Sequence, residues 1–189
     1  MGDPAFLSDR INSFSLVSYI PGPLGEFITN LRQDLVCGCV AQSHVTVLPP
    51  RPIEVPVEEA EAALRRRVEL YPAFEVEITN ISLFTQTSVV IAEIGAGRDE
   101  LIKMHAELNA GPLAFDEPYE YHPHITLAQN FPPEDLNAVF ASARQRWDSF
   151  PLRRSFPVES LIFVQNTVGN CWIDLAECEL RDAVAIESR

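Results

Sequence analysis

Two hydrophobic patterns alternate along this chain of 189 residues. One consists of short runs dominated by β-branched and aromatic residues, as in β-strands. The other repeats apolar residues every three or four positions, as in an amphipathic helix. The strand-like runs are residues 14–20, 44–48, 74–84, 87–94, 124–128, 155–167 and 169–177, and the helix-like runs are residues 24–35, 57–70, 98–108 and a segment that starts near Pro133. This order of elements predicts an α+β fold.

The second half of the chain repeats the plan of the first. HVTVLPP, followed by VEEAEAAL, resembles HITLAQNFPPEDLNAVF, and FEVEI at 74–78 resembles FPVES at 156–160. No linker is long enough to separate independent domains. We therefore expect a single bilobal domain over residues 1–189, with duplicated repeats at approximately 12–85 and 86–180. Two antiparallel sheets should face a central groove, with helices on their outer sides.

Each half carries a histidine and a threonine two positions apart inside an apolar strand. The pairs are His44 with Thr46 and His124 with Thr126. Residues i and i+2 of a strand point to the same face, so the apolar residues between them face the core. A pseudo-two-fold axis between the repeats would bring the pairs face to face across the groove. Two pairs at equivalent positions indicate a functional site, because half-buried imidazoles need partners.

Two facing histidines suit acid–base chemistry, since an unperturbed pKa of about 6.5 lets imidazole give or take a proton near neutral pH. One neutral ring could activate water or a hydroxyl group, and one protonated ring could protonate the leaving oxygen. The two threonine hydroxyl groups could donate to the non-bridging oxygens of a pentacovalent phosphorane, where negative charge accumulates. This set suits cleavage of a phosphodiester or opening of a cyclic phosphate. Because the halves are nearly symmetric, either histidine could be the acid.

The segments HVTV at 44–47 and HITL at 124–127 resemble the paired H-x-T-x signature of the two-histidine phosphoesterase superfamily. Their flanks, VTVLPP and YHPHITLA, resemble its branch of 2′-5′ RNA ligase-like proteins, the RNA 2′,3′-cyclic phosphodiesterases. The resemblance covers roughly residues 12–178. It implies a bilobal fold, metal-independent hydrolysis of 2′,3′-cyclic phosphates to 2′-phosphates, and in some members reversible 2′-5′ ligation.

Four residues carry over from this resemblance. His44 and His124 would be catalytic, and Thr46 and Thr126 would bind phosphate. Many relatives also have an arginine soon after the second motif, where this chain has Gln129, which keeps a donor but lacks the charge. Arg51, just past the first motif, either supplies a charge at the rim of the groove or is an ordinary surface residue. The missing positive charge is expected to affect the binding of polynucleotides more than the catalytic step.

Other histidines and arginines near the motifs have two interpretations each. His122 is either a rim residue that touches substrate or a loop histidine. A metal site with His124 is not expected, because no carboxylate or cysteine has supporting ligand spacing, and no cofactor is predicted. His105 is expected on the surface of its helix. Arg153 and Arg154 either line the groove entrance or form a solvated loop pair.

Aromatic residues could provide stacking platforms for a base. The candidates, each of which could instead belong to the core or the rim, are Tyr19, Tyr119, Tyr121 and Phe163. The four cysteines, in C-x-C and C-x6-C spacings, are interpreted as reduced structural thiols; they are Cys37, Cys39, Cys171 and Cys178.

The chain is strongly acidic, with 14 Lys and Arg against 27 Asp and Glu and a net charge of -13. Non-specific affinity for nucleic acid comes from neutralising phosphates, so a long duplex is not an expected partner. A small phosphate ester or an RNA 3′ end is compatible if arginine reverses the field inside a cleft. The start, MGDPAFLSDR, lacks signal-peptide features, and no apolar run reaches the roughly 18 residues of a membrane span. We therefore expect a cytoplasmic protein without membrane contact.

Three functions remain open at this point. The first is a metal-independent cyclic phosphodiesterase that opens 2′,3′-cyclic phosphates of RNA ends or nucleotides. The second is a non-catalytic binder of nucleotides or RNA ends that retains the same groove. The third is a structural domain whose histidines are incidental. Turnover of a nucleoside 2′,3′-cyclic phosphate in the presence of EDTA separates the first from the others.

Overall fold

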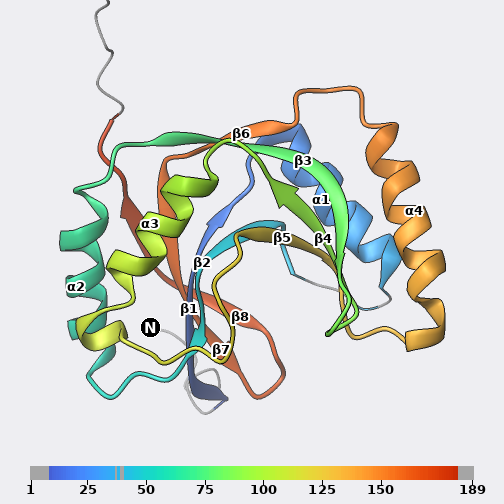
Figure 1. Ribbon diagram of the computed structural model, residues 1–189. Coiled ribbons are helices and arrows are strands. Elements are labelled where there is room, and N and C mark those ends of the chain that lie inside the picture. Colours follow the sequence, from blue (N-terminus) through green and yellow to red (C-terminus); the bar gives the residue numbers. More distant parts are fainter. Residues whose placement is uncertain (1–8, 37, 39–40, 183–189) are drawn as a thin grey trace, which may run out of the picture.

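The computed structural model describes residues 9–36, 38 and 41–182. Its strands form two antiparallel sheets of four strands each, which confirms the predicted α+β fold class (Figure 1). The first sheet has the order β2 (His44–Arg51), β1 (Arg10–Tyr19), β7 (Ser160–Thr167), β8 (Trp172–Glu179). The second sheet has the order β5 (His124–Ala128), β4 (Val89–Ile94), β3 (Phe74–Phe84), β6 (Ser155–Val158).

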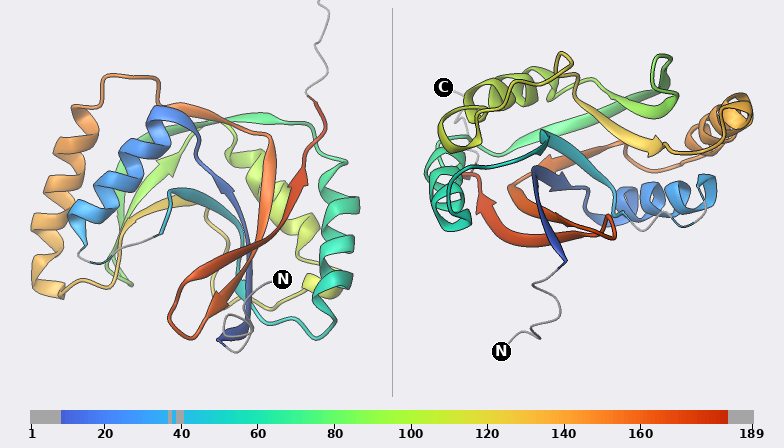
Figure 2. Two further views of the ribbon diagram at one scale, coloured as in Figure 1. Left: turned by 180° about the vertical axis from the view of Figure 1, so that it is seen from behind. Right: turned by 90° about the horizontal axis from the view of Figure 1, so that it is seen from below.

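Helices flank the two sheets in two groups. The α-helices are α1 (Gly22–Leu35), α2 (Val57–Val68), α3 (Arg98–Leu108) and α4 (Leu136–Asp148), with short 3-10 turns η2 (Gly111–Leu113) and η3 (Pro133–Asp135). Seen from below, the sheets lie one above the other, with α1 and α4 together at one end and α2 at the other (Figure 2). Helix α1 contacts strand β5 of the second sheet, and α3 contacts strand β2 of the first. A helix from each half of the chain therefore packs on a strand of the other half, and one hydrophobic core includes residues of both sheets.

Most predicted elements agree closely with the observed ones, and two differences have clear causes. Strand β2 continues through Pro49 and Pro50 to Arg51, because it is an edge strand that pairs only with β1 and a proline there breaks no second ladder. The single strand predicted at 155–167 is two strands, β6 and β7, which belong to different sheets. The chain crosses between the sheets at Glu159, directly after the edge strand that contains Pro157.

The two sheets do not follow the boundary between the repeats at residues 85 and 86. Strand β3 precedes that boundary but pairs with β4 in the second sheet, whereas β7 and β8 follow it and lie in the first. The segments 74–78 and 156–160, interpreted as repeat equivalents, overlap strands that pair with each other, with Phe74 opposite Val158. The strands with the His-x-Thr pairs do occupy equivalent places. Strand β2 is an edge strand beside β1, the first strand of the N-terminal half, and β5 is an edge strand beside β4, the first strand of the C-terminal half.

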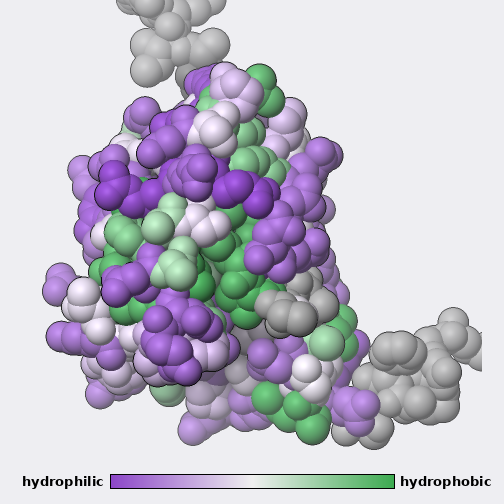
Figure 3. Space-filling view, turned by 90° about the vertical axis from the view of Figure 1, so that its right-hand side faces the viewer, coloured by the Kyte–Doolittle hydropathy of each residue, from purple (hydrophilic) through white to green (hydrophobic). Residues whose placement is uncertain are grey.

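The side of the molecule that carries α1 and α4 shows a band of hydrophobic residues between hydrophilic ones (Figure 3). Helix α4 buries Ala143 and Trp147, while Leu136, Val139 and Phe140 are only partly buried against the core. The helix thus covers the second sheet with one face and leaves its other face to solvent.

Two of the four cysteines are free thiols in the structure. Cys178 is buried and Cys171 is exposed, while Cys37 and Cys39 lie outside the described residues, as does the N-terminal segment 1–8. In the described part of the chain, none of the helices has the length and apolar character that crossing a bilayer requires.

Candidate active site

The two His-x-Thr strands have the same alternation of burial. In β2 the histidine and threonine are half-buried while Val45 and Val47 between and beyond them are fully buried, and β5 shows the same pattern with Ile125 and Leu127. The apolar residues face the helix layer, so the polar residues must face the other side. Strands β2 and β5 also contact each other. The local alternation puts each polar pair on one face of its strand, and the contact between β2 and β5 brings the two pairs together.

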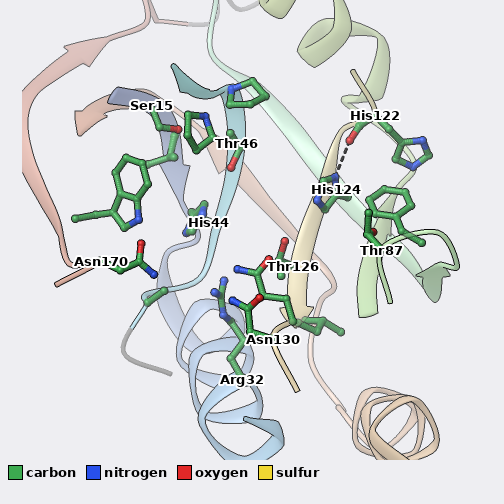
Figure 4. Close-up of a pocket in the computed structure, with 18 of the residues that line it drawn as sticks. Ser15, Arg32, His44, Thr46, Thr87, His122, His124, Thr126, Asn130 and Asn170 are labelled. Carbon is green, nitrogen blue, oxygen red and sulfur yellow. Dashed lines mark hydrogen bonds between the residues drawn. The ribbon is translucent and has the colours of Figure 1, made fainter. Parts of the chain in front are cut away.

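Both strands contribute to a cavity of about 1450 Å³. His44 and Thr46 line it from β2, and His124 and Thr126 line it from β5. Figure 4 shows the two strands side by side, with these four side chains directed into the space between them. The structure thus brings together the four residues that the sequence singled out.

Both imidazoles are held by the same kind of hydrogen bond. The Nδ1 atom of His44 lies 2.7 Å from the carbonyl oxygen of Gln42, and Nδ1 of His124 lies 2.7 Å from the carbonyl oxygen of His122. A carbonyl oxygen only accepts, so each Nδ1 carries the hydrogen and donates it. In the neutral ring the Nε2 atom is then left with a free lone pair, which is the form that a general base needs.

An aromatic ring packs edge to face on each imidazole. Tyr19 of β1 lies against His44 with ring centroids 6.4 Å apart, and Phe84 of β3 lies against His124 at 4.8 Å. The Tyr19 hydroxyl donates to Asp174 at 2.7 Å, which fixes its orientation. These contacts restrict the rotation of both rings, each of which packs against one aromatic side chain.

Burial favours the neutral form of both histidines. The pKa of His44 is lowered to about 4: burial is the largest cause, and the positive charge of Arg32 and the neighbouring His124 also lower it, against the hydrogen bond to Gln42. Burial also lowers the pKa of His124, an effect that Glu93 opposes. Both rings are therefore neutral near pH 7 in the free protein, and a negatively charged ligand would favour protonation of one of them.

Arg32 is a residue of this site that the sequence analysis did not select. It lies in the last turn of α1, is only 4% exposed and lines the cavity. Its Nε and Nη1 atoms have no hydrogen-bond partner among the described residues. A signal was present in the sequence, because Leu24, Ile28 and Arg32 follow one another at steps of four and so share the apolar face of the helix. A charged residue on such a face is unusual.

The sequence model of the 2′-5′ RNA ligase superfamily matches residues 26–170, which include both His-x-Thr strands. The chain belongs to this superfamily. A protein of Geobacillus kaustophilus with the provisional name phosphoesterase is 24% identical over 139 residues, which are 69% of this chain and 77% of that protein. A protein of Bacillus licheniformis with the same kind of name is 26% identical over 111 residues, 54% of this chain and 66% of its own length.

Solved structures share the fold of this superfamily member. Escherichia coli LigT aligns with a TM-score of 0.63 and 17% identity, covering 92% of this chain and 98% of LigT. A conserved protein of unknown function from Agrobacterium tumefaciens aligns with a TM-score of 0.52 and 16% identity over 93% of both chains. The fold is thus that of LigT, and membership of the superfamily supports a function of the phosphoesterase type.

Arg51 lies neither at the rim of the cavity nor on the surface of the protein, so both interpretations of this residue were wrong. Its side chain is 1% exposed and forms an ion pair with Glu117. It also donates to Asn109 Oδ1 at 2.7 Å and to the carbonyl oxygens of Leu113 at 2.9 Å and Pro49 at 2.9 Å. The pairing of β1 and β2 is irregular around Pro49 and Pro50, and Arg51 is not part of the cavity lining. It therefore fixes the loop after α3 to the end of β2.

His105 is also not the surface residue that was predicted. Its Nδ1 atom lies 2.8 Å from the carbonyl oxygen of Val47, and its ring stacks on Tyr121 with centroids 3.9 Å apart. Its side chain is 12% exposed. The helical pattern could not reveal this contact, because it depends on α3 packing against β2 from the other half of the chain.

His122 and Gln129 both line the cavity, as the rim interpretation requires. The Nε2 atom of His122 lies 2.8 Å from a carboxylate oxygen of Glu93, and its ring packs edge to face on Phe84 at 5.2 Å. Gln129 is exposed directly after β5. No group of three or more His, Cys, Asp and Glu side chains that could hold a metal ion occurs in the described ranges.

The remaining candidates divide between the cavity and the rest of the molecule. Tyr19, Tyr119 and Tyr121 line the cavity, whereas Phe163 is buried in the core, where it stacks on Phe14 at 5.4 Å. Arg153 pairs with Glu75 on the surface, and Arg154 stacks on Trp147 at 4.6 Å. Neither arginine belongs to the cavity lining, so the entrance interpretation of this pair was wrong.

Proposed function

We propose that this protein is a metal-independent phosphodiesterase that opens 2′,3′-cyclic phosphates of nucleotides or RNA ends. The observation that carries this proposal is the arrangement of His44 and His124. Two imidazoles from equivalent edge strands face one cavity, and each is fixed through Nδ1 so that Nε2 is free for proton transfer. Such a pair can supply a general base and a general acid in one reaction.

The two rings have different surroundings, which supports an assignment of their roles. Beyond burial, which lowers the pKa of both, the positive charge of Arg32 acts against a proton on His44. Beside His124, the charge of His122 also acts against a proton, but the nearby carboxylate of Glu93 favours one. His44 is therefore the base and His124 the acid. An incoming anionic phosphodiester stabilises the protonated form of His124 that the acid requires.

The reaction then proceeds in one displacement at phosphorus. Nε2 of His44 accepts a proton from water as the water oxygen forms a bond to phosphorus. The bond between phosphorus and the 3′ oxygen breaks, and protonated His124 gives its proton to that oxygen. The product is a 2′-phosphate. The hydroxyl groups of Thr46 and Thr126 donate to the non-bridging oxygens, whose negative charge is greatest in the pentacovalent transition state.

Crystal structures of E. coli LigT include complexes with phosphate, 3′-AMP, ATP and NADP+. Ligands with a phosphate and a nucleoside therefore support the choice of substrate class for this chain, either a small phosphate ester or an RNA 3′ end. The aromatic residues Tyr19, Tyr119 and Tyr121 on the cavity wall provide surfaces for a base. With an RNA 5′-hydroxyl in place of water as the nucleophile, the same steps in the same direction give a 2′-5′ linkage, and the 3′ oxygen leaves as a hydroxyl group.

The test is an assay with a nucleoside 2′,3′-cyclic phosphate in excess EDTA, with the 2′- and 3′-phosphate products separated by chromatography. We expect turnover to the 2′-phosphate, and a loss of at least about 10²-fold in His44→Ala and His124→Ala, the low end for general acid–base catalysis. Thermal melting of each variant checks that it is folded. Binding of the cyclic phosphate without turnover in the wild type would instead indicate a nucleotide or RNA-end binding protein.

A further inference from the structure

The guanidinium group of Arg32 is buried in the wall of the cavity. It is 4% exposed, and neither Nε nor Nη1 forms a hydrogen bond to a described residue. Figure 4 shows the side chain reaching from α1 into the space between His44 and Asn130. Burying a charge without compensation is costly, and buried polar groups in native proteins are almost always hydrogen-bonded.

Arg51 shows how the same fold treats a buried arginine with a structural role. It is 1% exposed, and its Nε, Nη1 and Nη2 atoms all bond to acceptors of the protein. Arg32 has a similar burial and lines the cavity, but its Nε and Nη1 atoms have no acceptor among the described residues. This contrast indicates that the acceptor for Arg32 is a ligand.

The charges around the cavity identify the kind of ligand. Arg32 is the single Lys or Arg among the described residues that line it, whereas Glu117, Glu120 and Asp174 contribute carboxylates. Burial lowers the pKa of both His44 and His124, so neither ring supplies a permanent positive charge near pH 7. In a chain with a net charge of -13, an anion that enters this cavity has one fixed cation to bind.

We propose that Arg32 binds a non-bridging oxygen of the reacting phosphate and supplies, from helix α1, the positive charge that Gln129 does not provide after the second motif. The planar fork of donors suits two phosphate oxygens at once. As the phosphorane forms, its oxygens gain negative charge, so the contact is stronger in the transition state than in the ground state. That the bound anion is the reacting phosphate rests on the proposed function.

The first experiment measures binding of inorganic phosphate by calorimetry or by NMR of the histidine rings, which requires no turnover. The variants are Arg32→Met and Arg32→Gln, and thermal melting verifies their folding. Arg66→Gln, an exposed residue of α2, is the control for the loss of one positive charge. We expect phosphate affinity to fall at least about tenfold in both Arg32 variants, as for a lost charged hydrogen bond, and to stay unchanged in the control. Unchanged affinity in a folded Arg32 variant would overturn the inference.

The second experiment measures kcat/KM for a nucleoside 2′,3′-cyclic phosphate. We expect a fall of about 10²–10³-fold in Arg32→Ala, mostly in kcat, comparable with loss of an oxyanion donor. Added guanidinium should restore part of the activity, because the ion can occupy the space left beside the cavity, and a purely structural role would give no such rescue. A fall below threefold would overturn the inference. Phosphate binding that depends on Arg32 in a wild type without turnover would refute the proposed function and leave an anion site at Arg32.

Discussion

The hydroxyl group of Tyr121 donates a hydrogen bond of 2.7 Å to the backbone carbonyl oxygen of Thr46. The ring of Tyr121 also stacks on His105, which bonds to the carbonyl oxygen of Val47. The segment that precedes the second His-x-Thr pair thereby holds the backbone of the first. Burial raises the pKa of Tyr121 above its usual value, so the hydroxyl keeps its proton and remains a donor.

Removal of this hydroxyl in Tyr121→Phe should lower the free energy of unfolding by about 1 kcal/mol, the usual contribution of one hydrogen bond. The backbone of Thr46 would then be less well fixed, so kcat should fall by a small factor while the pH dependence stays the same. Urea denaturation measures the first effect, and steady-state kinetics the second. Tyr119→Phe is the stability control, because Tyr119 is 70% exposed. Equal stability losses in the two variants would show that the Tyr121 hydroxyl has no special role.

The hydroxyl groups of Thr46 and Thr126 should contribute directly to the rate of the reaction. Replacing Thr46 or Thr126 by valine keeps the shape of the β-branched side chain and removes only the hydroxyl group. If each hydroxyl contacts a non-bridging oxygen in the transition state, kcat should fall about 10²–10³-fold with a small change in KM. Thr79→Val in β3, where the hydroxyl group donates to the carbonyl oxygen of Glu93 and the residue is not part of the described cavity lining, is the matched control. A loss below tenfold in Thr46→Val would mean that this hydroxyl does not touch the transition state.

The pKa shifts of the two histidines predict the pH dependence of the reaction. With His44 as base, kcat/KM should fall at low pH as His44 becomes protonated, near its lowered pKa of about 4. It should fall at high pH as His124 loses its proton, at a pKa also below the usual one. We therefore expect a bell-shaped profile with its maximum on the acid side of about pH 6.5. A flat profile between pH 5 and 9 would contradict a pair of imidazoles in opposite protonation states.

Arg32 provides a check on the low-pH limb of that profile. Its positive charge contributes to the lowered pKa of His44, after burial, so Arg32→Gln should raise that pKa and move the low-pH limb toward neutrality. NMR titration of the His44 ring measures the pKa directly in the absence of substrate. A limb that stays in place while the His44 ring titrates at higher pH would mean that His44 is not the base.

Arg51 should affect stability and have no direct part in binding. Arg51→Met removes the arginine partner of Glu117, whose side chain is only 11% exposed, and should cost roughly 3–5 kcal/mol of unfolding free energy. Arg146→Met breaks an exposed pair with Asp34 and should cost no more than about 1 kcal/mol. Denaturation curves of the two variants provide the comparison. A stable Arg51→Met variant with weakened phosphate binding would restore the rim interpretation of this residue.

Local sequence pattern was sufficient for most of the elements and for the centre of the site. The alternation around His44 and His124 determines which side chains point to the core and which point away, because that period is a property of the strand itself. Helix α3 and strand β5 have the bounds that their sequences predict. Residues whose environment comes from their own strand or helix are therefore readable from the chain.

Residues whose environment comes from a distant segment cannot be assigned from the local sequence pattern. The sequence by itself determined the two His-x-Thr pairs, the α+β fold and the family. Only the tertiary structure decided that Arg51 is committed to Glu117, that His105 supports β2, and that Arg32 enters the cavity. The physical reason is that the surroundings of these side chains are segments brought together by packing, and no local period encodes which charge will find a partner within the protein.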